Sequence, residues 1–447
     1  MPRPPGRVRD PIGHELGYPR GVTQGATSAI AHARSTDVGQ IREINEDFVL
    51  VDESLGLYVV CDGMGGHAAG EVASKTAAET VREVVAAGPM PAEMDTPALE
   101  ALMRSAVTEA NRRVHALGQQ AGSRRGMGTT CTALLVRGLR AAMAHVGDSR
   151  LYVRRGEAVH LMSQDHTFIA EAVRQGVIKP EDIRPDMPHA NIVTRAVGPK
   201  PSVLVDTLVF DLIPGDTLLL CSDGLHQYFM DPTELAARMG AEELEEIAPQ
   251  LVGTANERGG EDNISALVLR VLNAPQVAKR AGEITQTFSA LTHIHLFHEL
   301  SMNELAKVQE HLQHVAQRAG SVVFEQGETS EGLYIVSTGK VRVHRGDVQI
   351  AVLGEGAHFG EMALLNQRPR AATVTVLADA RLLYLSREAF YAVVQADTVI
   401  GVKFLWKLAQ TLSLRLDEAY ETPEQFLRQR ETLAFGLFPS PFSRKRK

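Results

Sequence analysis

Cysteine is scarce in this chain, with three residues among 447, namely Cys61, Cys131 and Cys221. They are far apart, odd in number, and spaced neither as a disulfide framework nor as a zinc site. Apolar residues surround each of them, so we expect small buried side chains within strands. This cysteine usage agrees with a reducing compartment and predicts a cytoplasmic protein.

An excess of positive charge is also lacking, because the chain has 46 Lys and Arg residues but 54 Asp and Glu residues. The net charge of -8 argues against nucleic acid as the main partner, since phosphate backbones recruit basic surfaces. No apolar run approaches the roughly 18 residues of a membrane span, so no membrane partner is expected. The first residues carry charge but no apolar core, unlike a secretory signal.

The length favours two domains, because it exceeds what one hydrophobic core usually serves. The apolar fraction of 44% and the charged fraction of 22% are typical of soluble globular proteins. Changes in composition and in helix and strand pattern along the chain predict a flexible tail over 1–24, a first domain over 25–272, a linker over 273–292, a second domain over 293–418 and a C-terminal tail over 419–447.

The first domain mixes short apolar runs with helical patterns. Strands are predicted over 55–62, 131–138, 141–155, 216–223 and 263–272, where apolar runs are bounded by Gly, Asp or Ser. Apolar spacing of three and four residues predicts helices over 74–87, 98–120 and 231–240. The irregular order favours an α+β layered domain over a doubly wound parallel sheet.

The second domain has a different pattern. One amphipathic helix is predicted over 296–315, and helix again over 387–418. Between them, 321–356 and 371–386 show short strands with Gly turns. Regular short strands at this spacing predict a β-barrel or jelly roll with flanking helices.

Six acidic residues of the first domain lie at strand ends beside Gly or another turn former. Carboxylates that converge would repel one another unless a cation lay between them. Oxygen ligands favour Mg²⁺ or Mn²⁺ over zinc, and two such ions roughly 4 Å apart can activate a water for in-line attack on phosphorus. Each residue taken alone could equally be a turn residue. The six are Glu46, Asp47, Asp62, Asp148, Asp223 and Asp262.

An ordered series of motifs accompanies these residues: STDVGQIREINEDF, CDGMGGH, GMGTTCTALLV, HVGDSRLYVRRGE, NIVTRAVG, GDTLLLCSDGL and GGEDNISALVLRV. In order and spacing they resemble the metal-dependent protein phosphatases of the PP2C class over roughly 25–272. The resemblance implies a layered β-sandwich flanked by helices. It also implies hydrolysis of phosphoserine and phosphothreonine in substrates of a Ser/Thr kinase.

The resemblance also implies roles for individual residues. Arg42 would grip the substrate phosphate, and Asp62 and Asp223 would be central to catalysis. One metal ion would be held by Glu46 or Asp47 with Asp62 and the backbone carbonyl of Gly63. The second would be held by Asp62, Asp223 and Asp262, and a third, weaker ion by Asp148. Asn263 would orient Asp262.

The general acid stays open. Some family members carry a His directly after the Asp-Gly pair, where this chain has Met64. His67 is the nearest histidine, and a surface role at a helix start explains it equally well. The stretch 163–195 matches the family's variable flap beside the active site.

Residues 358–376 carry the candidate ligand site of the second domain. Gly360, Glu361 and Ala363 open a short helical pattern, and exposed backbone N–H groups at a helix start attract phosphate. Arg370 follows and could neutralise that phosphate, and Glu361 offers an acceptor for a ribose hydroxyl. A jelly-roll turn with a surface ion pair is the alternative.

Residues 293–418 resemble the cyclic-nucleotide-binding domain of protein kinase A regulatory subunits and bacterial cyclic-AMP-responsive regulators. The resemblance implies that Glu361 binds the ribose 2′-OH, and Ala371 after the arginine favours cyclic AMP over cyclic GMP. Phe404, Trp406 and Tyr420 could stack on the base or simply pack. The residues implied to hold the cyclic phosphate are Gly360, Ala363, Arg370 and Ala371, and Ala372 is implied to take part in nucleotide binding.

Together these patterns predict a metal-dependent Ser/Thr phosphatase regulated by cyclic AMP. Two alternatives remain. The second domain could be a docking surface that binds no nucleotide, or the first could be an inactive sensor or scaffold.

Overall fold

The computed structural model describes residues 30–65, 69–89, 94–120, 126–179, 182, 192–273, 278–329, 331–366 and 368–420. These residues form two compact units: the described parts of 1–171 and 182–281 belong to the first, and those of 172–181 and 282–447 belong to the second. The predicted tail over 1–24 lies outside the described ranges, as does all but the start of the tail over 419–447. None of the helices within these ranges is long and apolar enough to cross a membrane. The predicted domain bounds stay predictions.

The first unit contains two antiparallel sheets. One has the strand order β1-β11-β10-β7-β8, and the other has the order β2-β3-β5-β6-β9 with β4 paired to β3. The first sheet comprises β1 (Ile30–Asp37), β7 (Arg150–Arg155), β8 (Ala158–Leu161), β10 (Thr217–Cys221) and β11 (Ile264–Val271). The second comprises β2 (Asp47–Asp52), β3 (Leu57–Met64), β4 (Gly128–Thr129), β5 (Cys131–Arg137), β6 (Arg140–Val146) and β9 (Asp206–Asp211).

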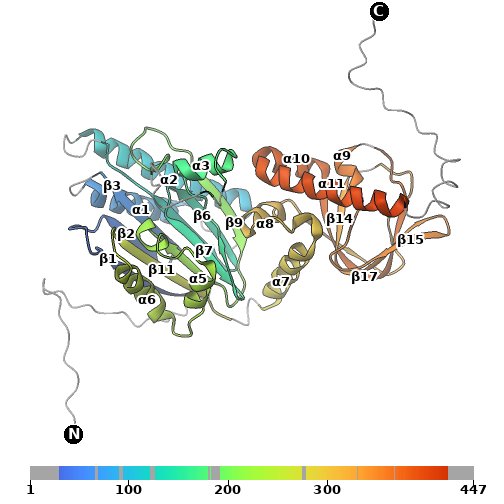
Figure 1. Ribbon diagram of the computed structural model, residues 1–447, viewed down its shortest axis with the longest axis horizontal. Coiled ribbons are helices and arrows are strands. Elements are labelled where there is room, and N and C mark those ends of the chain that lie inside the picture. The colour runs from blue at the N-terminus through green and yellow to red at the C-terminus, as the bar shows by residue number, and fades with distance from the viewer. Residues whose placement is uncertain are drawn as a thin grey trace, which may run out of the picture. The chain divides into compact units, whose positions relative to one another are not determined.

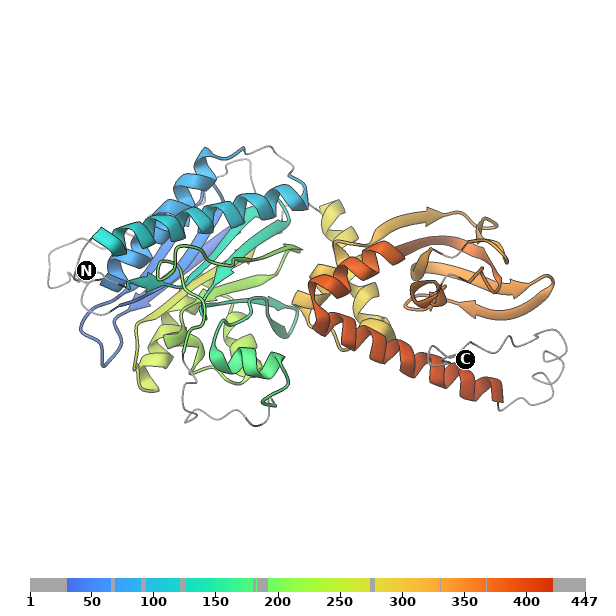
Figure 2. The same ribbon diagram turned by 90° about the horizontal axis from the view of Figure 1, so that it is seen from above.

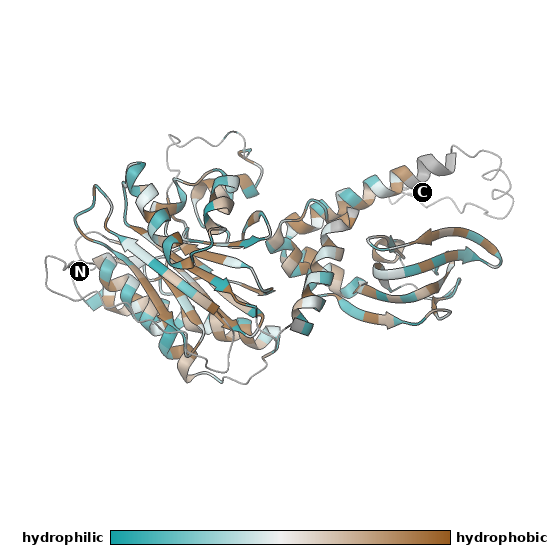
Figure 3. Ribbon diagram, turned by 90° about the horizontal axis from the view of Figure 1, so that it is seen from below, coloured by the Kyte–Doolittle hydropathy of each residue, from teal (hydrophilic) through white to brown (hydrophobic). Residues whose placement is uncertain are grey.

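Helices cover the outer face of each sheet, which gives a helix–sheet–sheet–helix sandwich (Figures 1 and 2). α1 (Ala69–Ala87) and α2 (Thr96–Gln120) bury apolar side chains against the second sheet. α4 (Asp223–His226), α5 (Pro232–Met239) and α6 (Leu244–Glu257) pack on the first sheet. α3 (Phe168–Arg174) lies in the predicted flap. Figure 3 shows apolar residues concentrated along the strands, as this layering requires.

The layered fold predicted for this domain is confirmed, and so are the three predicted helices. The buried strand positions of the three cysteines are confirmed as well. The interpretation of 141–155 as one strand is wrong. β6 and β7 belong to different sheets, and Gly147 turns the chain between them with a φ of 114°. That turn carries Asp148 out of the sheet, which an apolar run alone does not reveal.

The second unit contains one antiparallel sheet with the order β12-β17-β14-β15, to which β13 and β16 add short pairings. The long strands β14 (Gly332–Arg345) and β17 (Thr373–Ser386) pair along most of their length with several register shifts. The others are β12 (Gln313–Gln317), β13 (Val322–Phe324), β15 (Val348–Leu353) and β16 (His358–Phe359). The predicted jelly roll with flanking helices agrees with this arrangement.

The helices of this unit correct two predictions. The single helix over 296–315 is wrong: Ser301 caps a new helix through a capping box, and 313–317 pairs with β17 as a strand. The predicted linker 273–292 consists mostly of helix. The helical elements are α7 (Ala278–His293), the 3₁₀ turn His295–Phe297, α8 (Met302–Gln309), α9 (Met362–Leu365), α10 (Arg387–Ala396) and α11 (Thr398–Tyr420).

Candidate functional site

The strand-end carboxylates of the first unit gather at one end of the sandwich. Asp47 begins β2 and lies directly opposite Asp62 of β3 in the antiparallel register. Asp223 follows β10 and opens α4, and Asp262 precedes β11. Asp148 lies in the turn between β6 and β7. Antiparallel strands alternate in direction, so strand starts and strand ends meet at the same edge.

Glu46 and Asp47, which the sequence left as alternatives, have different surroundings. Asp47 is 8% exposed, and its Oδ2 accepts a hydrogen bond from the Ser222 hydroxyl at 2.8 Å. Glu46 turns its Oε1 to the backbone N–H of Gly70 at the start of α1, at 3.1 Å. The backbone carbonyl of Glu46 accepts from Gly63 N–H and from the Ser74 hydroxyl. The geometry therefore favours Asp47 as the ligand and Glu46 as a support.

Arg42 lies on the loop between β1 and β2, and its side chain is 50% exposed. Its guanidinium donates to Asp262 Oδ2 at 2.7 Å, which brings it to the acidic cluster. Asn263 holds this loop: its amide donates to the carbonyls of Val38 and Ile44, both at 2.9 Å. Its Oδ1 accepts from Glu46 N–H at 2.8 Å. Asn263 therefore fixes the loop that carries Arg42, a role broader than the predicted orientation of Asp262.

Burial and mutual repulsion raise the pKa values of the clustered carboxyls. Burial, with smaller contributions from Asp223 and Asp262, raises the pKa of Asp47 to about 8. The pKa of Asp148 rises to about 8 through burial and then Asp223. Burial and then Asp47 raise the pKa of Asp62 well above its usual range, and burial and then Asp262 raise that of Asp223. Groups that destabilise one another in this way are typical of a site built for a cation.

The cluster fits hard divalent cations. Asp47 Oδ1 and Asp223 Oδ1 are buried without a hydrogen-bond partner, so each has a lone pair to offer. A Cβ on Gly63 would lie 2.2 Å from Gly70 O and 2.6 Å from Glu46 O, so only glycine leaves its carbonyl this close to the cluster. The donors are all oxygen, as Mg²⁺ and Mn²⁺ prefer.

Two of these carboxylates bond to protein donors in this structure. Asp262 pairs with Arg42, and Asp47 bonds to Ser222. Within the described ranges, no three His, Cys, Asp or Glu side chains are already arranged around one ion.

Sequence reasoning missed several residues that position the carboxylates. Thr130 accepts from Asp62 N–H at 2.9 Å and bonds to the Ser149 hydroxyl at 2.6 Å, which ties β3 to the Asp148 turn. His226 bonds to the carbonyl of Asp148 through Nε2 at 2.9 Å. Burial lowers the pKa of His226 to about 3, so the ring is neutral and donates this bond. Thr130 lies within a recognised motif and His226 directly follows one, but only the folded contacts reveal what they do.

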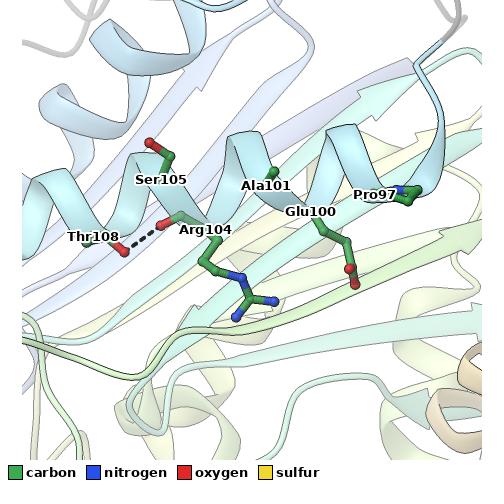
Figure 4. A pocket seen from close by; sticks show the side chains of 6 residues that line it. All are labelled: Pro97, Glu100, Ala101, Arg104, Ser105 and Thr108. Atoms are coloured by element: carbon green, nitrogen blue, oxygen red, sulfur yellow. Dashed lines mark hydrogen bonds between the residues drawn. The ribbon is translucent and has the colours of Figure 1, made fainter. Parts of the chain in front are cut away.

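Two predicted features remain outside this description. His67 and part of the flap, 180–181 and 183–191, lie outside the described residues, so the general acid stays open. The groove along α2, drawn in Figure 4, is a separate feature. Its volume is about 420 Å³, and none of the predicted site residues lines it. It is lined by Pro97, Glu100, Ala101, Arg104, Ser105 and Thr108.

The candidate cassette of the second unit is centred on Arg370, which is 7% exposed. Its guanidinium lies 4.1 Å from the centre of the Phe324 ring and donates to the carbonyls of Gly332 and Gly360. Its Nε is buried without a hydrogen-bond partner. Gly360 has a φ of 78°, and a Cβ there would meet the guanidinium at 2.5 Å. The cassette thus holds a buried cation with an unused donor.

The other cassette residues are placed around this cation. Glu361 is 5% exposed and directly precedes the four-residue helix α9. Ala363 is fully buried, and its N–H donates to Gly360 O at 3.0 Å. Ala371 is exposed and Ala372 half-buried.

The aromatic residues of α11 that could stack on a base lie differently. Phe404 is 2% exposed and packs against Phe297 and Phe390, so its stacking alternative is wrong. Trp406 is 61% exposed.

Comparisons with known proteins give one family match in each unit. The family described as Protein phosphatase 2C matches residues 42–258, and the family described as Cyclic nucleotide-binding domain matches residues 315–397. The serine/threonine phosphatase stp of Listeria monocytogenes is 36% identical over 238 residues, which are 52% of this chain and 93% of that protein. The protein phosphatase PhpP of Streptococcus pneumoniae is 34% identical over 239 residues, 52% of this chain and 94% of that protein. The crystal structure of serine/threonine phosphatase Stp1 from Staphylococcus aureus is 31% identical with a TM-score of 0.50, covering 57% of this chain and all of that one.

Proposed function

We propose, from the premise that this chain belongs to the protein phosphatase 2C family of Ser/Thr phosphatases, that its acidic cluster works with two divalent metal ions. The substrates are phosphoserine and phosphothreonine in proteins. The observation that carries this proposal is the set of buried carboxyls with raised pKa values and two oxygens that lack a hydrogen-bond partner. When bound, Mn²⁺ or Mg²⁺ would activate a water for in-line attack on phosphorus.

Each residue of the cluster has a role in this proposal. Asp47, Asp62 and the Gly63 carbonyl would hold one ion, and Asp62, Asp223 and Asp262 would hold the other. Asp148 would hold a third ion. Asp47, Asp62, Asp148 and Asp223 would lose their protons when a cation binds, because the cation offsets the burial and the repulsion that raise their pKa values.

Arg42 would bind the substrate phosphate. Half of its side chain is exposed, and a planar guanidinium that already pairs with Asp262 keeps donors for phosphate oxygens. The bond to Asp262 holds the guanidinium at the edge of the cluster. The phosphate would therefore be bound beside the carboxylates.

For the second unit, the proposed ligand is a cyclic nucleotide, with cyclic AMP favoured by Ala371. The buried guanidinium of Arg370 and its unused Nε donor support a phosphate there. Binding would regulate the phosphatase. A coupling free energy of about 1–3 kcal/mol would change activity roughly 5- to 150-fold.

Metal binding tests the first part directly. We expect the metal-free chain to bind two or three Mn²⁺ ions in an isothermal titration, and Asp62→Asn to lose most of this binding because it removes the bridging carboxylate. Glu46→Gln is the matched control, since that side chain faces Gly70 rather than the cluster. Unchanged Mn²⁺ binding by Asp62→Asn would refute the assignment.

Nucleotide binding tests the second part. Titration with cyclic AMP should show one site per chain, and Arg370→Gln should weaken binding at least tenfold, because a buried charge partner of the phosphate is lost. Arg345→Ala is the control, since this exposed arginine donates only to the Ala371 carbonyl among the contacts described. A chain that binds no cyclic nucleotide would leave the domain as a docking surface.

A further inference from the structure

The exposed loop over 38–46 is held in place by several hydrogen bonds and by a close backbone approach at Gly39. Gln40 N–H donates to Gly260 O at 2.7 Å, and Asn45 donates to the Thr36 hydroxyl at 2.9 Å. Asn263 holds both ends of the loop through the bonds described above. Gly39 has a φ of 83°, and a Cβ there would lie 2.2 Å from Asp262 O. The loop is therefore fixed against the β11 edge of the acidic cluster.

This fixed loop presents apolar side chains to solvent on both sides of Arg42. Ile41 is 70% exposed and Ile44 is 45% exposed. Single exposed apolar residues are ordinary. A pair that brackets the proposed phosphate-binding arginine on a rigid loop is different, because any peptide that delivers its phosphate to Arg42 must cross the same surface.

We propose that this loop selects phosphoprotein segments with bulky apolar side chains next to the phosphorylated residue. The inference rests on the proposed phosphatase function and names the substrate class of the same site. Substrate side chains packed on Ile41 and Ile44 would remove apolar surface from water, and the fixed loop would lose little conformational freedom on binding. Glu43 is exposed between them and disfavours acidic neighbours of the phosphorylated residue.

Matched phosphopeptides test the proposal with the full-length chain in Mn²⁺. Two phosphothreonine peptides of equal charge carry either Leu or Ala on both sides of the phosphothreonine. We expect kcat/KM to be roughly 5- to 20-fold higher for the Leu peptide, the range expected for partial burial of two such side chains. In the double variant Ile41→Ala/Ile44→Ala, the ratio should fall to within about twofold.

Two controls separate this inference from the proposed function. Leu204→Ala removes another exposed apolar side chain, 63% exposed, and should leave the Leu-to-Ala ratio unchanged. Wild-type hydrolysis of p-nitrophenyl phosphate, which has no flanking residues, reports the phosphatase chemistry alone. If that reagent is hydrolysed while the wild-type peptide ratio lies near one, or the ratio survives in the double variant, the substrate inference is overturned. If neither peptide nor reagent is hydrolysed, the proposed function itself fails.

Discussion

At Asp47, a carboxylate suited to metal binding lowers the stability of the metal-free fold. The chain buries a carboxylate beside Asp62 and Asp223 and compensates only in part, through hydrogen bonds from Ser222 and Ser265 that lower its pKa. A bound cation would offset the remaining free-energy cost of burying this carboxylate. Function and stability therefore make opposite demands at this position until metal binds.

The pKa of Asp47 leads to a prediction for the metal-free protein. Burial raises the pKa of Asp47 in the folded chain to about 8 from the ordinary aspartate value of 3.8, so the folded chain binds more protons than the unfolded chain between these pH values. The contribution to stability is then present below pH 4 and is lost as the pH rises through about 8. We expect metal-free wild type to lose stability relative to Asp47→Asn between pH 5 and pH 8.5, measured by urea unfolding.

The difference between the two proteins is the relevant quantity, because other groups titrate in both. Saturating Mn²⁺ should remove most of the pH dependence in the wild type. A wild-type chain that gains stability over the variant as the pH rises would contradict the assigned burial.

The choice between Glu46 and Asp47 marks the limit of prediction from sequence at this scale. Both are acidic, adjacent and part of one motif. Only two features of the folded chain distinguish them as candidate ligands. The strand register places Asp47 opposite Asp62, and Glu46 bonds to Gly70. Neither contact leaves a signal in local composition.

At the scale of elements, the strand ends were largely predictable, because apolar runs that stop at Asp are strong signals. The break at Gly147 was not, since the run over 141–155 is apolar on both sides of the turn. The helix over 296–315 failed for a similar reason. Its periodicity continues past Leu312, but pairing with β17 makes 313–317 a strand. Tertiary pairing overrides local pattern at such points.

The element most open to test is the loop over 38–46. Asn263→Ala would leave Glu46 N–H and the carbonyls of Val38 and Ile44 without their partner. We expect KM for a phosphopeptide to rise roughly tenfold or more, because Arg42 is no longer held at the phosphate position. Steady-state kinetics would separate this effect from a loss in kcat.

Gln40→Ala provides the comparison for that variant. Its side chain makes a single exposed bond of 3.3 Å to Asn256, so little change in KM is expected. Equal effects of the two substitutions would show that the loop is not positioned through Asn263.

At the scale of the whole molecule, a phosphatase unit and a cyclic-nucleotide-binding unit lie on one chain. The nucleotide can change activity only if it binds one state of the chain more tightly than another. The difference in binding free energy between the two states limits the size of that change. We expect saturating cyclic AMP to change kcat or KM of the wild type roughly 5- to 150-fold and to leave Arg370→Gln unaffected. If the nucleotide binds but kcat, KM and Mn²⁺ affinity all stay constant, regulation must be abandoned.

The most direct test of the metal centre is phosphate release from a phosphothreonine peptide by the metal-stripped full-length chain as Mn²⁺ is added. The account predicts no release without metal, a rise to saturation with Mn²⁺, and a loss of at least about 100-fold in Asp223→Asn, a typical cost of removing an essential electrostatic partner. Release that needs no metal, or that is undiminished in Asp223→Asn, would contradict it.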